Sequence, residues 1–226
     1  METKTVKELC ELVVDCPHST PAWTDYGKIV VRNNNIKNGW IDLSSPSFTD
    51  DEHFQQRIKR AIPKHGDLII TREAPMGEVG MVPNGVECCL GQRMVLLRVN
   101  PEICDNYYLL YSLQSRYVQH QISWSEGTGT TVSNLRIPHL EQLKIPYIDI
   151  TKQRAVTSVL RAIEQKVSHN RKINDNFSGL ELDVRDIDLA GHEARQKSVS
   201  KISKLYDFLS ICSYFPVDCV EGMDNR

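Results

Sequence analysis

Residues 151–177, "TKQRAVTSVLRAIEQKVSHNRKINDNF", contain neither glycine nor proline and begin with a threonine that suits a helix N-cap. Seven positions in this run follow alternating spacings of four and three residues: Val156, Leu160, Ile163, Val167, Asn170, Asn174 and Phe177. That spacing is the a/d seam of a coiled coil, sustained for about three heptads. The run therefore predicts a long helix that pairs with another helix. A surface helix packed on its own domain is the alternative.

The chemistry of the run favours the pairing helix. Asparagines at seam positions can fix the register and number of partners in a coiled coil at some loss of stability. Residues 151–172 hold six Lys and Arg against one Glu, so the outer face of the helix is basic. Ser178-Gly179 interrupts the pattern, and residues 178–226 are predicted to be a divergent C-terminal segment with a second amphipathic helix at 192–211.

Residues 1–150 have a different pattern, in which short apolar runs alternate with turn residues. Asn-Gly between two apolar pieces is a strong hairpin signal. Strands are expected at residues 27–32, 36–43 (a hairpin around Asn38-Gly39), 67–73, 78–83 and 92–99, and within 135–150 as two short strands. Helices are expected at residues 50–62 and 106–122. The chain is therefore predicted to be α+β, a small β-rich domain at 1–150 followed by a coiled-coil-forming helix at 151–177.

The stretch "PKHGDLIITREAPMGEVGMVP", residues 63–83, resembles a phosphate loop at first sight because of its closely spaced glycines. A phosphate site needs a strand that leads into a helix N-terminus, and here one strand leads into another. We therefore expect a framework hairpin in which Gly77 closes the turn and Gly80 permits a bend or a close approach.

No catalytic constellation emerges from the sequence. It contains no Walker A motif, no dinucleotide-binding glycine pattern, no G-x-S-x-G elbow and no Pro-Pro pair of the kind found in amino-group DNA methyltransferases. Asp67, Glu73 and Lys64 can be assembled into a nuclease-like trio, but such common residues meet by chance in most chains. We predict that the chain is not an enzyme and binds no cofactor.

The composition limits the class further. Seven cysteines occur without a C-x-x-C pair, and the seven histidines form no H-x-x-x-H pair, so reduced thiols and no metal site are expected. No apolar run approaches the roughly 20 residues that cross a membrane. The N-terminus lacks the apolar core of a signal peptide, and a cytoplasmic protein is expected.

Several loops carry residues that suit nucleic acids. Arginine forks match guanine edges and phosphates, asparagine and glutamine match adenine, and glycine–threonine loops bring amides and hydroxyls close to phosphates. The segment 53–65 also holds four basic residues and no acid. The candidate DNA contacts are Arg32, Asn33, Asn34, Lys37, Arg57, Arg60, Arg72, Gln92, Arg93, Thr128, Thr130 and Thr131.

Five ordered pieces give the chain a family resemblance over roughly residues 5–177: "IPKHGDLIITREAPMGEVGMVP", "GQRMVLLRV", "YYLLYSLQS", "GTGTTVSNL" and "LEQLKIPYIDITKQRAVTSVLRAIEQKV". In this order they resemble the target-recognition domain and adjoining helix of a specificity (S) subunit of a type I restriction–modification enzyme. Five pieces at sensible distances are far more specific than any one of them.

The resemblance implies a non-catalytic reader of double-stranded DNA that recognises one half of a split sequence. It also implies three kinds of partner: a methyltransferase subunit, a motor–nuclease subunit and a second spacer helix. Members of this family usually carry two recognition domains and two helices, whereas this chain carries one of each. We therefore expect a half-subunit that forms a homodimer. The alternative is a truncated module that binds methyltransferase subunits without directing modification.

Overall fold

The computed structural model describes residues 2–124 and 134–178. The chain divides into two compact units, one formed by residues 2–154 and the other by the residues from 155 onward. The first unit contains every strand of the described residues, and the second contains most of the long helix α6 (Ile150–Ser178).

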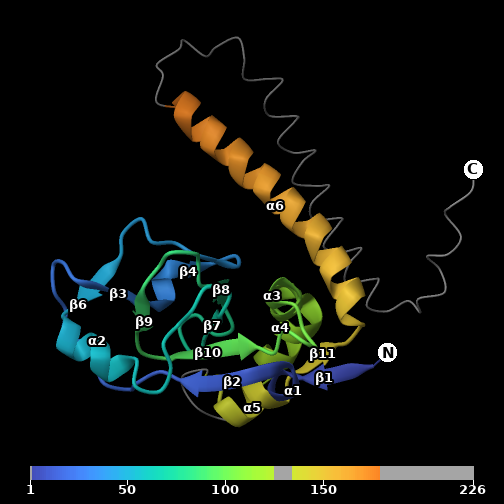
Figure 1. Ribbon diagram of the computed structural model, residues 1–226, viewed down its shortest axis with the longest axis horizontal. Coiled ribbons are helices and arrows are strands. Elements are labelled where there is room, and N and C mark those ends of the chain that lie inside the picture. Colours follow the sequence, from blue (N-terminus) through green and yellow to red (C-terminus); the bar gives the residue numbers. More distant parts are fainter. Residues whose placement is uncertain (1, 125–133, 179–226) are drawn as a thin grey trace, which may run out of the picture. The chain divides into compact units, whose positions relative to one another are not determined.

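The larger sheet of the first unit has four antiparallel strands in the order β2 (Cys10–Asp15), β10 (Met94–Val99), β7 (Leu68–Thr71) and β8 (Val79–Met81) (Figure 1). β10 lies between β2 and β7, so Leu97 is opposite Val13 on one side and Leu68 on the other. Its run "MVLLRV" is almost entirely apolar because both faces of the strand are buried.

The smaller sheet has the order β6 (Ser47–Thr49), β3 (Lys28–Val31) and β9 (Cys88–Leu90), with β3 and β9 parallel. Two further antiparallel pairs complete the strands: β4 (Ile36–Lys37) with β5 (Trp40–Ile41), and β1 (Thr3–Thr5) with β11 (Lys144–Pro146). The β1–β11 pair joins the first strand of the unit to its last.

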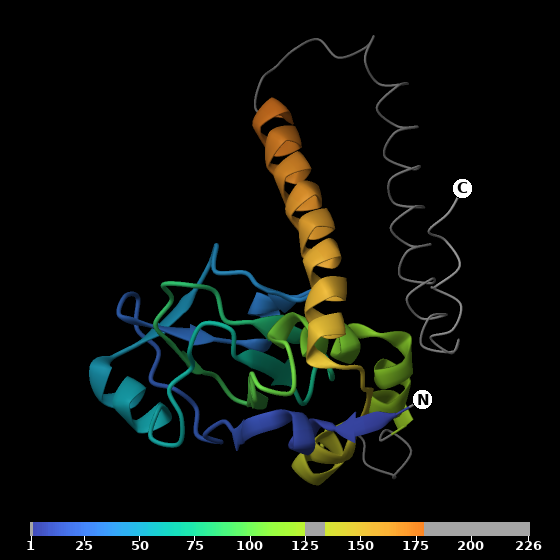
Figure 2. The same ribbon diagram turned by 45° about the vertical axis from the view of Figure 1, so that its right-hand side comes forward.

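Short helices cover the sheets. They are α1 (Val6–Leu9), the 3₁₀ turn η1 (Asn33–Asn35), α2 (Asp51–Arg57), α3 (Asn106–Gln114), α4 (Arg116–Ser123) and α5 (Ile137–Gln142). Figures 1 and 2 show α1 and α5 side by side. Most of these helices begin at a side-chain cap: Thr5, Asp50, Asp105 and Ser115 each accept a hydrogen bond from a backbone N–H of the first turn.

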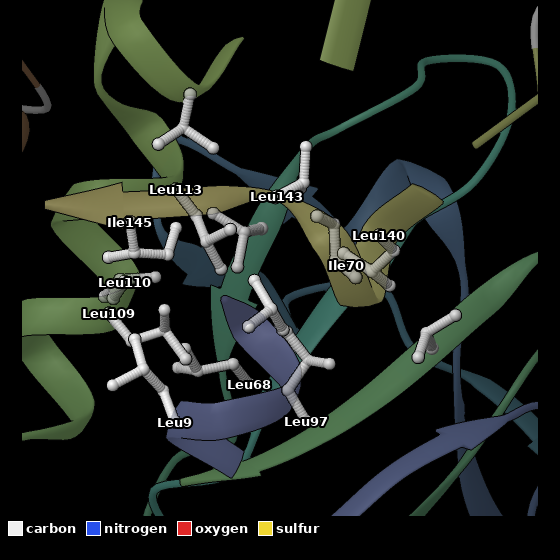
Figure 3. Packing of buried hydrophobic residues seen from close by; sticks show 14 of the residues in the cluster. Leu9, Leu68, Ile70, Leu97, Leu109, Leu110, Leu113, Leu140, Leu143 and Ile145 are labelled. Atoms are coloured by element: carbon white, nitrogen blue, oxygen red, sulfur yellow. The ribbon is translucent and has the colours of Figure 1, made fainter. Parts of the chain in front are cut away.

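The main hydrophobic core lies where α1, α3, α5, β7, β10 and β11 meet (Figure 3). Leu9, Leu68 and Leu97 converge there with Leu110 and Ile145, and all five side chains are buried. Cys88, Cys89 and Cys104 are also buried, and burial raises the pKa of their thiols to about 12, about 11 and about 12. These cysteines are therefore small hydrophobes, as expected.

Both predicted hairpins are confirmed. Asn38 and Gly39 have φ angles of 49° and 88°, as the turn between β4 and β5 requires. Gly77, with φ 83°, closes the turn between β7 and β8 through its N–H, which donates to Thr71 O at 2.9 Å. A Cβ on Gly80 would lie 3.0 Å from both Ile41 Cγ1 and Trp40 O, so its glycine permits close approach of the β4–β5 hairpin.

Three predicted elements are wrong in their bounds or their type. The helix expected at 106–122 is two helices, because Ser115 ends α3 and its hydroxyl caps α4. The helix expected at 50–62 ends at Arg57, six residues before Pro63. The first strand expected within 135–150 is helix α5, whose first turn contains Pro138.

Helix α6 begins one residue before the predicted N-cap Thr151. Asp149 caps it instead, since its carboxylate accepts a hydrogen bond from Thr151 N at 2.8 Å, and this bond lowers the pKa of Asp149. Leu160, Ile163 and Val167 are partly buried, whereas Asn170 and Asn174 are exposed. Phe177 lies in the helix but its side chain is outside the described residues, as is the helix predicted at 192–211. The coiled-coil pairing of α6 stays a prediction.

The predicted mixture of helices and strands in one domain is confirmed, while six elements were not predicted: β1, α1, β2, η1, β6 and β9. Within residues 2–124 and 134–178, no three or more metal-ligating side chains gather into a site. None of the helices in those ranges is both long and apolar enough to cross a bilayer.

Gln153 ties the first turn of α6 to the compact unit. Its side chain is fully buried, and Oε1 accepts a hydrogen bond from Asp105 N at 2.9 Å. Nε2 donates to Ile103 O at 3.1 Å and to Ile148 O at 2.8 Å. One amide thus satisfies three buried backbone groups from two separate segments.

Replacing Gln153 with Met should lower the free energy of unfolding by about 1–3 kcal/mol, because those backbone groups lose their partner without gaining water. The exposed Gln142→Met in α5 is the matched control and should change it by about 0.5 kcal/mol or less. Urea unfolding followed by tryptophan fluorescence measures both. Equal losses would mean that the amide of Gln153 contributes nothing specific.

Candidate nucleic-acid interface

One end of the larger sheet gathers charged residues from several strands. β2, β7 and β10 are antiparallel, and their register places Asp15 opposite Val95 and Thr71 opposite Met94. The residues that flank these strand ends therefore meet at one end of the sheet. We call this end the polar edge and define it by Asp15, Arg72, Glu73, Arg93 and Asn134.

Arg72 holds the polar edge together. Its Nη1 donates to both carboxylate oxygens of Asp15 at 3.1 Å, Nε donates to Leu135 O at 3.0 Å, and Nη2 donates to Asn134 Oδ1 at 3.3 Å. Its backbone N–H donates to Arg93 O at 2.8 Å. The side chains of Arg72 and Asp15 are only 13% and 16% exposed. The sequence-based prediction that Arg72 contacts DNA therefore finds no support, since every guanidinium nitrogen already has a partner.

Glu73 brings two further loops to the polar edge. Its Oε1 accepts a hydrogen bond from Asn134 Nδ2 at 2.7 Å, and its Oε2 lies 3.1 Å from Arg93 Nε. Its backbone oxygen accepts a hydrogen bond from Asn33 Nδ2 at 2.6 Å, which attaches η1. Asn33 Oδ1 is itself buried and accepts no hydrogen bond within the part of the chain that the structure describes.

Arg57 is also part of the framework, contrary to its predicted role as a DNA contact. Its side chain is buried, and its three nitrogens donate to Leu90 O, Ser19 O and Pro17 O at 2.8, 3.0 and 3.3 Å. Burial lowers the pKa of this guanidinium below its usual value. Arg57 therefore fixes the loop that follows β2.

Gln92 and Arg60 contact the same loop. Gln92 Nε2 donates to His18 O at 2.7 Å and to Thr20 Oγ1 at 3.2 Å, while Arg60 Nη1 donates to Asp15 O at 3.4 Å. Arg60 itself is exposed. The structure thus brings Gln92 and Arg60 to the loop after β2, beside the polar edge to which Arg93 belongs.

Arg32, Asn34 and Lys37 are exposed on η1 and on the hairpin that follows it. The guanidinium carbon of Arg32 lies 5.0 Å from the centre of the Trp23 ring, and Arg32 Nη1 donates to Ser47 Oγ at 3.4 Å. The exposed Trp23 and Trp40 were not among the predicted site residues, because a sequence does not show which aromatic side chains reach the surface. Thr128, Thr130 and Thr131 lie outside the described residues, although Asn134, which follows their loop, belongs to the polar edge.

The fold matches the architecture of known specificity subunits. The crystal structure of the HsdS subunit from Thermoanaerobacter tengcongensis aligns with a TM-score of 0.56 at 17% identity, covering 77% of this chain and 45% of that one. A second structure, described as the basis of complex assembly and conformational transition of the type I R-M system, gives the same values. The fold is thus that of an HsdS-like protein.

The sequence gives the family itself. The profile of the type I restriction modification DNA specificity domain matches residues 1–176, and the chain belongs to this family. The resemblance inferred from the five ordered motifs is thereby confirmed. The proteins it resembles are named specificity subunits, which agrees with the prediction that the chain is not an enzyme.

Two curated relatives come from Methanocaldococcus jannaschii. The type I restriction enzyme MjaVIII specificity subunit is 22% identical over 195 residues, which are 84% of this chain and 45% of that protein. The putative MjaX specificity subunit is 26% identical over 125 residues, 55% of this chain and 28% of that protein. The matched residues therefore cover less than half of the length of either relative.

Replacing Arg72 with Met should lower the free energy of unfolding by about 3 kcal/mol, because the largely buried Asp15 carboxylate loses its arginine partner, although His18 Nε2 stays 3.0 Å from it. Arg93→Met is the matched control at the same edge, and we expect a loss of about 1 kcal/mol or less, since the Arg93 side chain is 58% exposed. Urea unfolding measures both variants. A similar loss in the two would contradict the assignment of Arg72 to the framework.

Proposed function

We propose that the chain is a non-catalytic DNA-recognition subunit of a type I restriction–modification system, reading one half of a split sequence. The observation that carries the proposal is the family match over residues 1–176. The site supports it, since exposed cationic and amide side chains from three loops lie around the polar edge. Among the predicted DNA contacts, the structure leaves five exposed at the polar edge, close to it or on the adjoining hairpin: Arg32, Asn34, Lys37, Arg60 and Arg93.

The net charge of the domain limits how strongly the chain can bind DNA by itself. Residues 1–150 hold 15 Lys and Arg against 18 Asp and Glu, so the domain has little general attraction for phosphates. We propose that a methyltransferase subunit supplies most of the phosphate contacts and the chemistry, and that a motor–nuclease subunit joins the full complex in the cytoplasm. The chain alone is then expected to bind DNA weakly.

We propose that α6 pairs with the same helix of a second copy. Its apolar seam at Leu160, Ile163 and Val167 is only partly buried, and a charged surface surrounds it. A dimer with twofold symmetry presents its two recognition domains symmetrically. The preferred DNA site is then a symmetric split sequence whose two halves are equivalent.

The test is to express the chain with a methyltransferase subunit of the same system and to map methylated adenines across the host genome. We expect one split, symmetric motif to be methylated only when both proteins are present. A stable complex of the two without any methylated motif would contradict DNA recognition and favour a module that only occupies the methyltransferase.

The seam is tested separately by Leu160→Asp combined with Ile163→Asp. Charges at a and d positions should abolish self-association, so the mass in sedimentation equilibrium should fall to that of one chain. Ser158→Asp with Gln165→Asp is the control, because these exposed positions lie opposite the seam and have the same propensity cost. If the wild type and both variants have the same mass, α6 does not mediate pairing.

A further inference from the structure

Arg93 has an unusual combination of a fixed backbone and an exposed side chain. Its φ angle is 64°, a left-handed conformation that is uncommon for a residue other than glycine. Its carbonyl accepts the N–H of Arg72 at 2.8 Å. The next residue, Met94, is fully buried, and its N–H donates to Cys16 Sγ at 3.2 Å. The backbone at Arg93 is therefore held on both sides.

The side chain of Arg93 is positioned from one side only. Nε lies 3.1 Å from Glu73 Oε2, and the side chains of Arg93 and Glu73 are 58% and 18% exposed. Glu73 is itself fixed by the hydrogen bond from Asn134. Neither terminal nitrogen of Arg93 donates a hydrogen bond to a residue among 2–124 and 134–178. The Nη1/Nη2 pair, two parallel donors on a largely exposed side chain, is thus available to an acceptor outside the described residues.

The ion pair with Glu73 decides which kind of DNA contact suits this arginine. A phosphate bound at Arg93 would lie close to the Glu73 carboxylate, and the two negative charges would repel each other. A guanine edge is uncharged and offers two acceptors, O6 and N7, that match two parallel N–H donors. The carboxylate therefore weakens phosphate binding by Arg93 and leaves the base contact favourable.

The other arginines of the region are less suited to that contact. Arg57 and Arg72 have all their guanidinium nitrogens bound inside the framework. Arg32 lies over the Trp23 ring without a carboxylate partner among the described residues, which leaves its charge available to a phosphate.

We infer that Arg93 reads a guanine through its Nη1/Nη2 pair, and that Glu73 is the positioning residue that holds it in place. This inference rests on the proposed function and deepens it by naming the base and the residue. A side chain that is positioned before binding loses less conformational freedom on contact, which favours a specific interaction.

The experiment is a selection from random DNA duplexes by the chain in complex with its methyltransferase subunit, at one fixed salt concentration. The wild type should enrich a motif that contains a G·C pair. Arg93→Ala should lose discrimination at that pair alone, by roughly 5- to 150-fold, with the remaining positions unchanged. Arg93→Lys should weaken it as well, because the single nitrogen of an ammonium does not match the two parallel N–H donors of a guanidinium.

Glu73→Gln should relax the same G·C pair, and the double variant with Arg93→Ala should be no worse than Arg93→Ala alone. Lys7→Ala is the matched control, because Lys7 is also an exposed cation in an ion pair, with Nζ 3.3 Å from Glu141. Lys7 is in α1, next to the start of β2, whereas the polar edge lies at the other end of that strand. The Lys7→Ala variant should enrich the wild-type motif. Thermal unfolding of each variant shows that the protein tested is folded, and Arg93→Lys retains the charge if Arg93→Ala does not fold.

Three outcomes would overturn the inference. An unchanged motif with uniformly weaker binding in the Arg93 variants means a phosphate contact. If the wild type enriches a motif in which no G·C pair depends on Arg93, guanine reading by Arg93 is excluded. The proposed function is not affected by that result. No motif with the wild type contradicts the proposed function itself, and the inference falls with it.

Discussion

The hydrogen bonds of the Arg72 guanidinium are the interaction on which the functional end of this domain depends. A planar group with five donors joins the end of β2 to the segment at Asn134 and Leu135, while the backbone N–H of Arg72 donates to Arg93 O beside the start of β10. Few side chains other than arginine can bind a carboxylate, an amide oxygen and a backbone carbonyl at once. The surrounding loops are thereby attached to the central sheet, which gives exposed residues such as Arg93 a rigid base.

Some arginines of this molecule are buried in its framework and others are exposed on its surface. A count of charges along the sequence does not distinguish the two groups. The acid-free segment 53–65 suggests an electrostatic surface, yet Arg57 is buried there because carbonyls at residues 17, 19 and 90 reach it. Those partners are more than 30 positions away in the chain, so no local pattern reveals them. The sequence around Arg93 does not distinguish it from the buried Arg57. Arg93 nevertheless remains exposed, because Glu73 is the only described partner of its side chain.

The difference between local and distant contacts also explains how much of the fold was predictable. The hairpins around Asn38-Gly39 and Gly77 follow from backbone conformations that few residues adopt, so local chemistry suffices. Strands such as β6 and β9 have three residues each and form only because β3 lies between them, which is a tertiary effect. Ser115 is acceptable inside a helix and also caps one, so the sequence alone does not show the break between α3 and α4. The order of the motifs identified the family, while the site residues needed the structure.

The pairing of β1 with β11 has a consequence for how the protein is made. Thr5 lies opposite Lys144, so β1 has to wait for almost the whole domain before its partner strand is synthesised. Until then Val6 and Leu9, which are fully buried in the finished domain, lack the α5 and β11 residues that cover them. A contact between such distant parts of the chain slows folding, and β1 and α1 stay accessible to chaperones in the meantime.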